Sequence, residues 1–355
     1  MPFQCLNHAM FILPHYCENT DRRAVFASVN AFVSLPIASL GGGHLIPDKF
    51  TLRFFITALV TLLISLTAAH AGDRTRIGYG RLITNDFIGD AKDRWRSGSV
   101  ASSRVWGPEW SGQLPSGIGE IIELRLGAEI IAPENLTTFR SADRRYATSL
   151  SIGAHTHYLA GKTEVAAGVD LVFVGPQSGL SQFQRALHNA LGVPEPDDSV
   201  LRNQVANSIN PTVAFELGRS LDLSERTHVR PFVEARAGVE TYMRAGFDLT
   251  FGALGRGELL TRDTVSGQRY RTIANDWTGL SAVFGADIAY VGSSVYFPET
   301  RGPIVNKTRE RVRLGVHWQG KKDTAMFYGM TWLGEEFEGQ DGGQLIGSAR
   351  LNFRF

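Results

Sequence analysis

Hydrophobic and polar residues alternate along most of the second half of the chain and part of the first. The clearest alternation lies between Glu120 and Ala132, where every even-numbered position from Ile122 to Ile130 is apolar and the odd-numbered positions between them are Glu, Arg or Gly. A period of two is typical of a β-strand with two unlike faces. The segments predicted as strands are Arg76–Thr84, Gly98–Trp106, Glu120–Ala132, Tyr146–Leu159, Val165–Phe173, Val213–Leu217, His228–Glu240, Gly246–Phe251, Leu280–Tyr290, Arg311–Trp318, Thr324–Trp332 and Leu345–Phe355.

An even number of amphipathic strands predicts an all-β fold, a closed antiparallel transmembrane β-barrel of about 12 strands. In such a barrel the ladders satisfy every backbone group, apolar side chains face lipid and charged side chains line the interior. The short connections Ala160–Lys162, Ser224–Arg226 and Gln319–Lys322 all fall at the end expected to be periplasmic. Two long connections at the same end, Gly107–Gly119 and Gly255–Asp276, depart from this pattern.

The last predicted strand ends on an aromatic residue, Phe355. A terminal aromatic on an amphipathic strand is typical of bacterial outer-membrane barrels, so the expected partners include the barrel assembly machinery, through Phe355, and the outer membrane itself. One alternating strand would fit a soluble β-sandwich equally well. The many charged residues on the polar faces of the other strands, such as Glu123 and Asp287, favour the membrane barrel.

The longest apolar run in the sequence, Phe54–Ala69, has the features of a secretory signal peptide. Lys49 and Arg53 precede it, and the small residues at its end suit a cleavage site before Gly72. A transmembrane helix is the competing interpretation, but a span needs about 20 apolar residues. The predicted domains are residues 1–48 as an extension upstream of the true translation start or a disordered segment, 49–71 as the signal peptide, and 72–355 as the barrel.

Composition removes several function classes. The chain has 355 residues, a formal net charge of +1 and 20% charged residues, so nothing points to a nucleic-acid partner. Its two cysteines, Cys5 and Cys17, both precede the predicted signal peptide. The mature chain therefore offers no disulfide, thiolate metal site or cysteine nucleophile.

A short helix is predicted in an extracellular loop, from Ser181 to Leu191, because Gly192 and Pro194 follow it as terminators. Gln184 and His188 lie one turn apart on one side of this helix. The neighbouring face carries four apolar residues, and we expect this face to pack on the barrel rim. The four are Phe183, Leu187, Ala190 and Leu191.

The motifs of this first half resemble the outer-membrane lipid A 3′-O-deacylase family, whose members remove an ester-linked acyl group from lipopolysaccharide and form twelve-stranded barrels. The matching pieces run in order from residue 85 to residue 204. They are Asn85-Asp86, Asp93-Arg94 through Ser97-Gly98, Asp143 through Ala147, Val174 through Gly179, Gln184, His188 and Gln204.

The resemblance implies a calcium-dependent hydrolysis of the 3′-linked ester of lipid A at the outer leaflet. His188 matches the family's catalytic histidine and would take a proton from the attacking water, as an imidazole does near neutral pH. Asn85 and Asp86 match the metal-site pair and offer hard oxygen ligands. Gln184 would either orient His188 or pack the helix on the rim.

The sequence departs from the family pattern at the start of the second strand. Arg96 stands where a hydroxyl is usual, and the neighbouring Ser97 is a candidate catalytic residue, although adjacent strand residues point to opposite faces. Arg96, Arg144 and Arg145 are expected near the outer leaflet, where guanidinium groups can bind lipid phosphates or remain solvated.

Two other functions remain open at this stage. The first is a non-catalytic barrel, a pore or structural protein, that keeps only the family fold, and Arg96 is its best support. The second is an outer-membrane phospholipase, which would need a serine nucleophile beside a histidine.

Overall fold

The computed structural model describes residues 74–298, 302–321 and 324–352. The predicted N-terminal extension, the signal peptide and Phe355 lie outside these ranges. Among the described residues, no helix has the length and apolar character needed to cross a membrane. The domain boundaries predicted from the sequence therefore stay predictions.

Twelve antiparallel strands close into a barrel, as the alternation predicted. Closure is made by β1 pairing with β15 and by β6 pairing with β8. The strands of the wall are β1 Thr75–Asn85, β2 Trp95–Gly107, β3 Ile121–Ala132, β4 Ala147–Ala160, β5 Thr163–Val174, β6 Ser208–Gly218, β8 Thr227–Ala237, β9 Glu240–Phe251, β12 Gly279–Ser294, β13 Thr308–Gln319, β14 Ala325–Leu333 and β15 Gln344–Asn352. A four-residue strand, β7 Leu221–Ser224, pairs only with β8.

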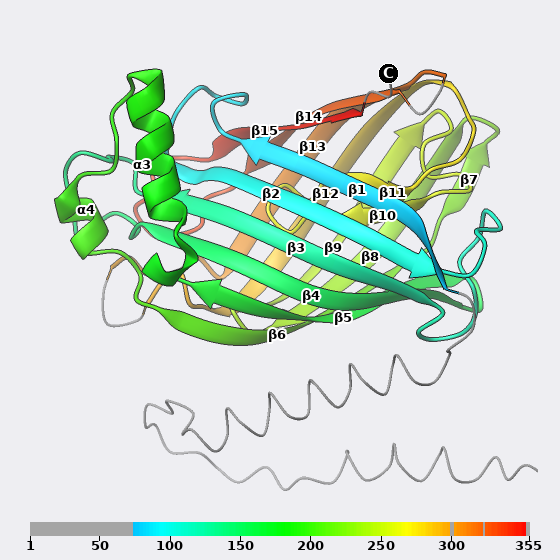
Figure 1. The fold of residues 1–355 in the computed structure, drawn as a ribbon, viewed down its shortest axis with the longest axis horizontal. Coiled ribbons are helices and arrows are strands. Elements are labelled where there is room, and N and C mark those ends of the chain that lie inside the picture. The colour runs from blue at the N-terminus through cyan, green and yellow to red at the C-terminus, as the bar shows by residue number, and fades with distance from the viewer. Residues whose placement is uncertain (1–73, 299–301, 322–323, 353–355) are drawn as a thin grey trace, which may run out of the picture. The chain divides into compact units, whose positions relative to one another are not determined.

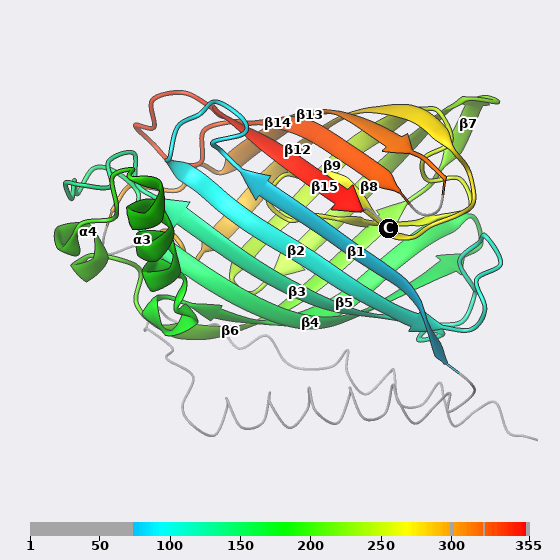
Figure 2. The same cartoon turned by 45° about the horizontal axis from the view of Figure 1, so that its top comes forward.

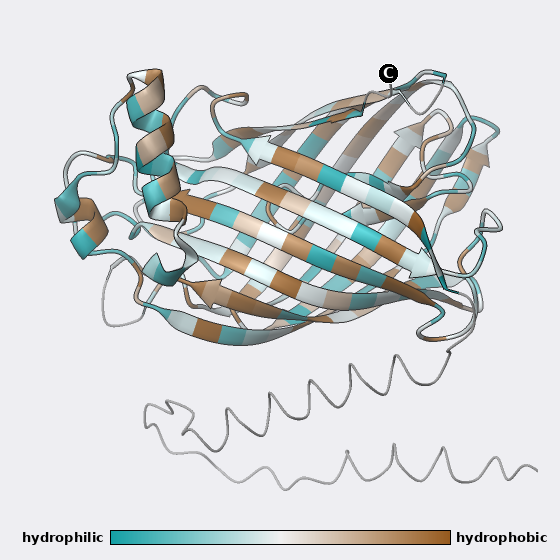
Figure 3. Cartoon of the chain, viewed as in Figure 1, coloured by the Kyte–Doolittle hydropathy of each residue, from teal (hydrophilic) through white to brown (hydrophobic). Residues whose placement is uncertain are grey.

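Each wall strand presents its apolar side outward. On β13, for example, Leu314 is 59% exposed, whereas the neighbouring Arg313 is 2% exposed and points inward. Figure 3 shows the resulting bands of apolar and polar residues across the wall. Burying charge inside and exposing apolar side chains outside is the pattern of a barrel whose solvent is lipid.

The two ends of the barrel differ in their connections. One end carries the long connection between β5 and β6, with the 3-10 turn η1 Pro176–Ser178 and the helices α3 Leu180–Leu191 and α4 Asp198–Arg202 (Figure 1). The opposite end has the tight turn between β4 and β5. We call the helical end the outer end, because outer-membrane barrels keep short turns in the periplasm and longer loops outside.

The predicted helix forms, but the expectation about its packing is wrong. The side chains that α3 buries are Ser181, Gln184 and His188. Phe183 is 59% exposed and Leu191 is 66% exposed, so the apolar stripe does not pack on the rim. The polar side makes specific hydrogen bonds to the loops around it, described below, and these fix the helix instead.

The long connection between β9 and β12 folds back into the barrel. It forms a hairpin of β10 Leu259–Arg262 and β11 Arg269–Ile273, which pair only with each other. A Cβ placed on Gly78 of β1 would lie 2.2 Å from the carbonyl oxygen of Thr272, so the wall needs glycine there to admit the hairpin. The connection at 255–276, which is unusually long for the periplasmic end, therefore forms an element inside the lumen.

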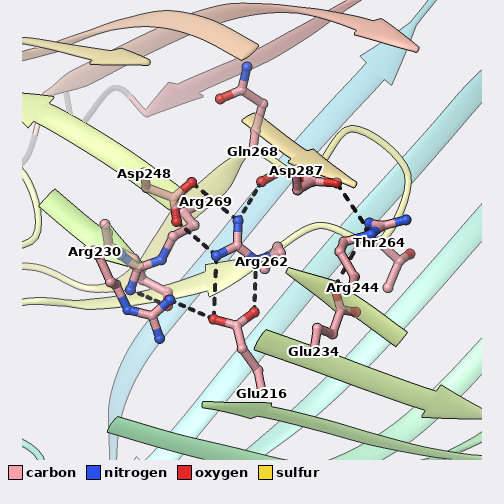
Figure 4. A network of polar contacts seen from close by, with 12 residues as sticks. Glu216, Arg230, Glu234, Arg244, Asp248, Arg262, Thr264, Gln268, Arg269 and Asp287 are labelled. Atoms are coloured by element: carbon pink, nitrogen blue, oxygen red, sulfur yellow. Dashed lines mark hydrogen bonds and ion pairs between the residues drawn. The ribbon is translucent and has the colours of Figure 1, made fainter. Parts of the chain in front are cut away.

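Arginine and carboxylate side chains fix the hairpin to the wall (Figure 4). Arg262 of β10 donates from Nε to Glu216 of β6 at 2.7 Å and from Nη2 to Asp248 of β9 at 2.8 Å. Its guanidinium also lies 3.6 Å from the ring centre of Phe232. Nearby, Asp287 is paired with Arg311 and Arg313 from the next strand. These ion pairs compensate the charges that the barrel encloses.

The second long connection of the periplasmic end, between β2 and β3, packs against the first. Trp110 donates from Nε1 to the carbonyl oxygen of Gly257 at 2.9 Å. Val105, Ile121, Leu259 and Ile273 form a small apolar core beneath this contact. A cavity of about 230 Å³ lies between the hairpin, these loops and the wall at this end.

We predict that Arg262→Ala destabilises the folded barrel by about 1.5–3 kcal/mol, because it removes charge-assisted hydrogen bonds to two buried carboxylates. Glu216 and Asp248 each keep one other arginine partner. Urea unfolding in detergent or bilayers measures this change. Arg256→Ala is the control, since Arg256 pairs with the exposed Asp222, and such a pair contributes at most about 1 kcal/mol. Equal effects of the two substitutions would contradict a structural role for the hairpin.

Candidate functional site

The connection between β1 and β2 forms one wall of a polar site at the outer end. Asn85 shapes this connection: its Nδ2 donates to the carbonyl oxygen of Ser97 at 2.8 Å, and its Oδ1 accepts from the backbone N–H of Phe87 at 2.9 Å. Asp86 is 1% exposed and accepts from the backbone N–H of Arg94 at 2.8 Å. Both side chains therefore take part in hydrogen bonds that shape the connection between β1 and β2.

A β-bulge corrects the expectation for Ser97. The β2–β3 register places Arg96 opposite Ile131 and Gly98 opposite Ile130, so Ser97 is an extra residue in β2. A bulge breaks the strict alternation of faces. Arg96 consequently points into the lumen, and the Ser97 hydroxyl is aimed at Asp93, where Oγ donates to Oδ1 at 2.5 Å.

Asp93, a residue for which the sequence predicts no role of its own, links the two sides of the site. Its Oδ2 lies 3.2 Å from Nε2 of His188 on α3. Its Oδ1 accepts from Ser97 and, at 3.5 Å, from Nε2 of Gln184. The Asp93 side chain is 37% exposed, so the site is open to the outside at this residue.

The backbone around α3 decides which nitrogen of His188 is available. Its Nδ1 lies 2.7 Å from the carbonyl oxygen of Pro194, which can only accept a hydrogen bond. Nδ1 therefore carries a proton, and Nε2 is the nitrogen that can gain or lose one. Gly192, in a left-handed conformation with φ of 68°, ends α3 and turns the chain so that Pro194 reaches His188.

Gln184 makes hydrogen bonds to residues on two sides of the site, and both interpretations of its role stay predictions. Its Oε1 accepts from the hydroxyl of Tyr146 at 2.7 Å, which turns its Nε2 toward Asp93. Burial and the negative charge of Asp93 both raise the pKa of Tyr146, so this phenol stays protonated as a donor. Tyr146, Gln184 and Asp93 thus form a chain of hydrogen bonds that ends at His188.

The Asp86 carboxyl is electrostatically unusual. Burial and, next, the nearby charge of Asp93 raise its pKa to about 8. Hydrogen bonds from two backbone N–H groups lower the pKa, but they offset only part of this rise. Among the residues that the structure describes, no three His, Cys, Asp or Glu side chains form a metal-binding group. The oxygens of Asn85, Asp86 and Asp93 nevertheless have the hard-donor chemistry that calcium prefers.

Arg96 and Arg144 do not reach the outer surface, so both expectations for them are wrong. Arg96 is 7% exposed and donates to Glu336 at 3.0 Å and 2.6 Å and to Glu129 at 2.5 Å. Arg144 is 1% exposed and also pairs with Glu336. Burial alone would raise the pKa of Glu336, but Arg96, Arg144 and Arg309 hold it well below its usual value.

Arg145, the third arginine of that prediction, contacts protein at the outer end. Its Nη1 donates to the carbonyl oxygen of Asn203 at 2.7 Å. Gln204, the last residue of the sequence match, donates to the carbonyl oxygen of Leu201 in the α4 segment. Both side chains therefore stabilise loop structure around the site.

Gln344 of β15 fixes the far side of the bulge. Its Oε1 accepts from the backbone N–H of Arg96 at 3.0 Å, and its Nε2 donates to the carbonyl oxygen of Arg94 at 2.5 Å. The residue is 2% exposed. Sequence gave no signal for this contact, because Gln344 and Arg94 are 250 positions apart.

Comparisons with known proteins agree with this architecture. The family model described as "Outer membrane protein LpxR" matches residues 54–355. The solved structure of LpxR from Salmonella typhimurium matches with a TM-score of 0.60 at 15% identity, covering 78% of this chain and 100% of that chain. That likeness shows the fold alone. No curated protein sequence matches the chain.

Porins and channels match less well. The KdgM porin in complex with disordered oligogalacturonate gives a TM-score of 0.33 at 6% identity, covering 78% of this chain and 99% of that chain. The CymD monoaromatic hydrocarbon channel gives 0.31 at 13% identity, covering 82% and 91%. Scores this low carry no argument about function.

We predict that Asp86 makes the barrel less stable as pH rises from about 4 to about 8 when a chelator is present. Its pKa is about 8 in the folded chain, against an ordinary value of 3.8 for an aspartate in the unfolded chain, so in this window only the folded state holds the proton. The difference in urea midpoint between the wild type and Asp86→Asn, measured across this range, isolates the effect. A difference that does not change with pH would contradict it.

Proposed function

Because the chain belongs to the LpxR family of outer membrane proteins, we propose that it is an outer-membrane lipid A deacylase that hydrolyses the 3′-linked acyl ester of lipopolysaccharide with His188 as general base. One observation carries the proposal above the others. His188, with Nδ1 committed to Pro194, directs Nε2 toward Asp93 beside the buried Asp86. A base, a carboxylate and hard oxygen donors at one exposed edge suit ester hydrolysis.

In the proposed reaction His188 accepts a proton at Nε2 as water attacks the ester carbonyl. The imidazolium is stabilised by Asp93, whose Oδ2 lies 3.2 Å away. The proton then passes from Nε2 to the departing sugar oxygen, so the products are a fatty acid and a free hydroxyl. Ser97 and Gln184 hold Asp93 in position and do not attack the substrate themselves.

We propose that Asn85 and Asp86 hold a calcium ion, with Asp93 as the adjacent carboxylate. The donor set fits, since all three side chains offer hard oxygens and a buried carboxylate needs a compensating cation. Asn85 Oδ1 accepts one backbone hydrogen bond, which leaves its second lone pair for a ligand role. The ion would supply electrostatic stabilisation of the oxyanion.

The arginine at position 96, which replaces a hydroxyl of the family pattern, is compatible with the proposed activity. Its guanidinium pairs with Glu336 and Glu129 in the lumen, so it neither blocks the site nor occupies the place of a hydroxyl there. The bulge brings the Ser97 hydroxyl to the site instead. This geometry supports turnover despite the departure from the family pattern.

The proposal includes the route to the substrate. The outer-membrane barrel fold supports an outer-membrane location. Export through a cleaved signal peptide at residues 49–71, and recognition of Phe355 by the barrel assembly machinery, remain parts of this proposal. Lipid A of the outer leaflet is the proposed partner of the folded enzyme.

We predict that His188→Ala lowers lipid A deacylation by about 10²–10⁴-fold, the usual contribution of a general base. Mass spectrometry of lipid A from cells that express the variant measures the loss. Gln182→Ala, on the same helix but exposed, should keep full activity. Retained deacylation in a His188→Ala variant would overturn the proposed role, provided that both proteins show the heat-dependent gel shift of folded barrels.

We further predict that chelation of calcium lowers activity by about 10²–10³-fold, as loss of oxyanion stabilisation does in other hydrolases. Adding calcium back should restore turnover in the wild type but not in Asp86→Asn. Purified protein with a defined lipid A substrate is the measurement of choice. Full activity after exhaustive chelation would exclude the calcium step while leaving the histidine role testable.

A further inference from the structure

The apolar stripe of α3 has no protein partner among the described residues. Phe183, Leu187 and Leu191 follow one another at intervals of four residues, and they are 59%, 44% and 66% exposed. Val193, just after the helix, is 45% exposed. Residues four apart lie on the same side of a helix, so these side chains form one continuous stripe. A stripe of large apolar side chains on a protein surface indicates a contact surface.

The helix has three distinct sides. Gln184 and His188 contact the site, and with 3.6 residues per turn the apolar stripe lies roughly a quarter turn away from them. Gln182 and Asn189 are exposed and lie on the side facing away from the stripe. Protein, apolar and polar sides in this order are expected for a helix at a boundary between a protein wall, lipid and water.

The turn that leads into α3 is attached to the wall beside a residue that faces lipid. The turn η1, which leads into α3, is tied to the outer ends of β4 and β6: Ser178 Oγ donates to Thr148 Oγ1, and Gln177 Nε2 donates to the carbonyl oxygen of Ser208. The next residue, Ile209, is 43% exposed on the outward face of β6. Figures 1 and 2 both place α3 across the outer ends of the neighbouring strands.

The other wall of the site contacts the lipid-facing side as well. Phe87 is 74% exposed at the tip of the β1–β2 connection. The next residue, Ile88, accepts from the hydroxyl of Tyr328, an outward-facing residue of β14 that is 46% exposed. Apolar side chains that meet the lipid-facing surface therefore flank the site on two sides.

We propose that α3 is an interfacial helix whose stripe of Phe183, Leu187 and Leu191 contacts the acyl chains of the outer leaflet. The partner is a lipid surface, and the contact needs no catalysis. One consequence of this contact rests on the proposed function. The inner side of the same helix carries His188, so an ester at the head of the acyl chains would approach the base along α3.

Single-cysteine spin labelling tests the contact, and the predicted mature chain is suited to it because both native cysteines precede residue 18. Leu187→Cys is placed in the His188→Ala background and reconstituted in lipid bilayers. We expect the label at 187 to collide with oxygen several-fold more than with a water-soluble nickel complex. Leu314→Cys, on the outward face of β13, supplies the lipid reference, and Gln182→Cys supplies the water reference.

Two outcomes would overturn the inference. A label at 187 that is as accessible to nickel as the label at 182 would place the stripe in water. A label protected from both oxygen and nickel would show a protein contact, such as a second copy of this chain. Leu191→Cys repeats the test if the first variant fails to fold. Because the background is inactive by design, the result does not depend on whether the protein deacylates lipid A.

Discussion

Every backbone polar group that crosses the hydrocarbon must find a partner within the protein, and this constraint governs the whole structure. Closure of β1 onto β15 and of β6 onto β8 meets it for the wall. The apolar side chains then face outward, so the charges of the strands are enclosed. Enclosed charges need partners in turn, and the hairpin with Arg262 supplies some of them. A lumen filled in this way gives no support to the alternative of an open pore.

The wall could be predicted from sequence because a period of two is a local signal. All twelve strands occur, and the helix at 180–191 begins within one residue of its prediction. One boundary is wrong, because the predicted strand His228–Glu240 crosses the turn between β8 and β9, which begins at Glu240. The β10–β11 hairpin could not be predicted in this way. Its strands are four and five residues long, and they are buried on all sides, so no alternation marks them.

The site was predicted in its residues but not in its geometry. Gln184 and His188 both contact Asp93, and their catalytic roles, like those of Asn85 and Asp86, stay predictions from the family resemblance. The role of Asp93 and the displacement of Arg96 depend on the bulge at Ser97, and one extra residue in a strand leaves no trace in the residue types. The prediction that the apolar side of α3 packs on the rim was also wrong. An apolar stripe on a helix predicts packing against protein, but the same stripe also suits a helix that lies at a membrane surface, which is the contact proposed for α3.

The contacts of Gln344 make the site dependent on the completion of the barrel. This side chain belongs to the last strand, yet it holds the backbone on both sides of Trp95, at the start of the second strand. A chain whose first and last strands have not yet paired lacks this support for the loop that carries Asp93. The geometry of the loop that carries Asp93 therefore depends on closure of the barrel between its first and last strands.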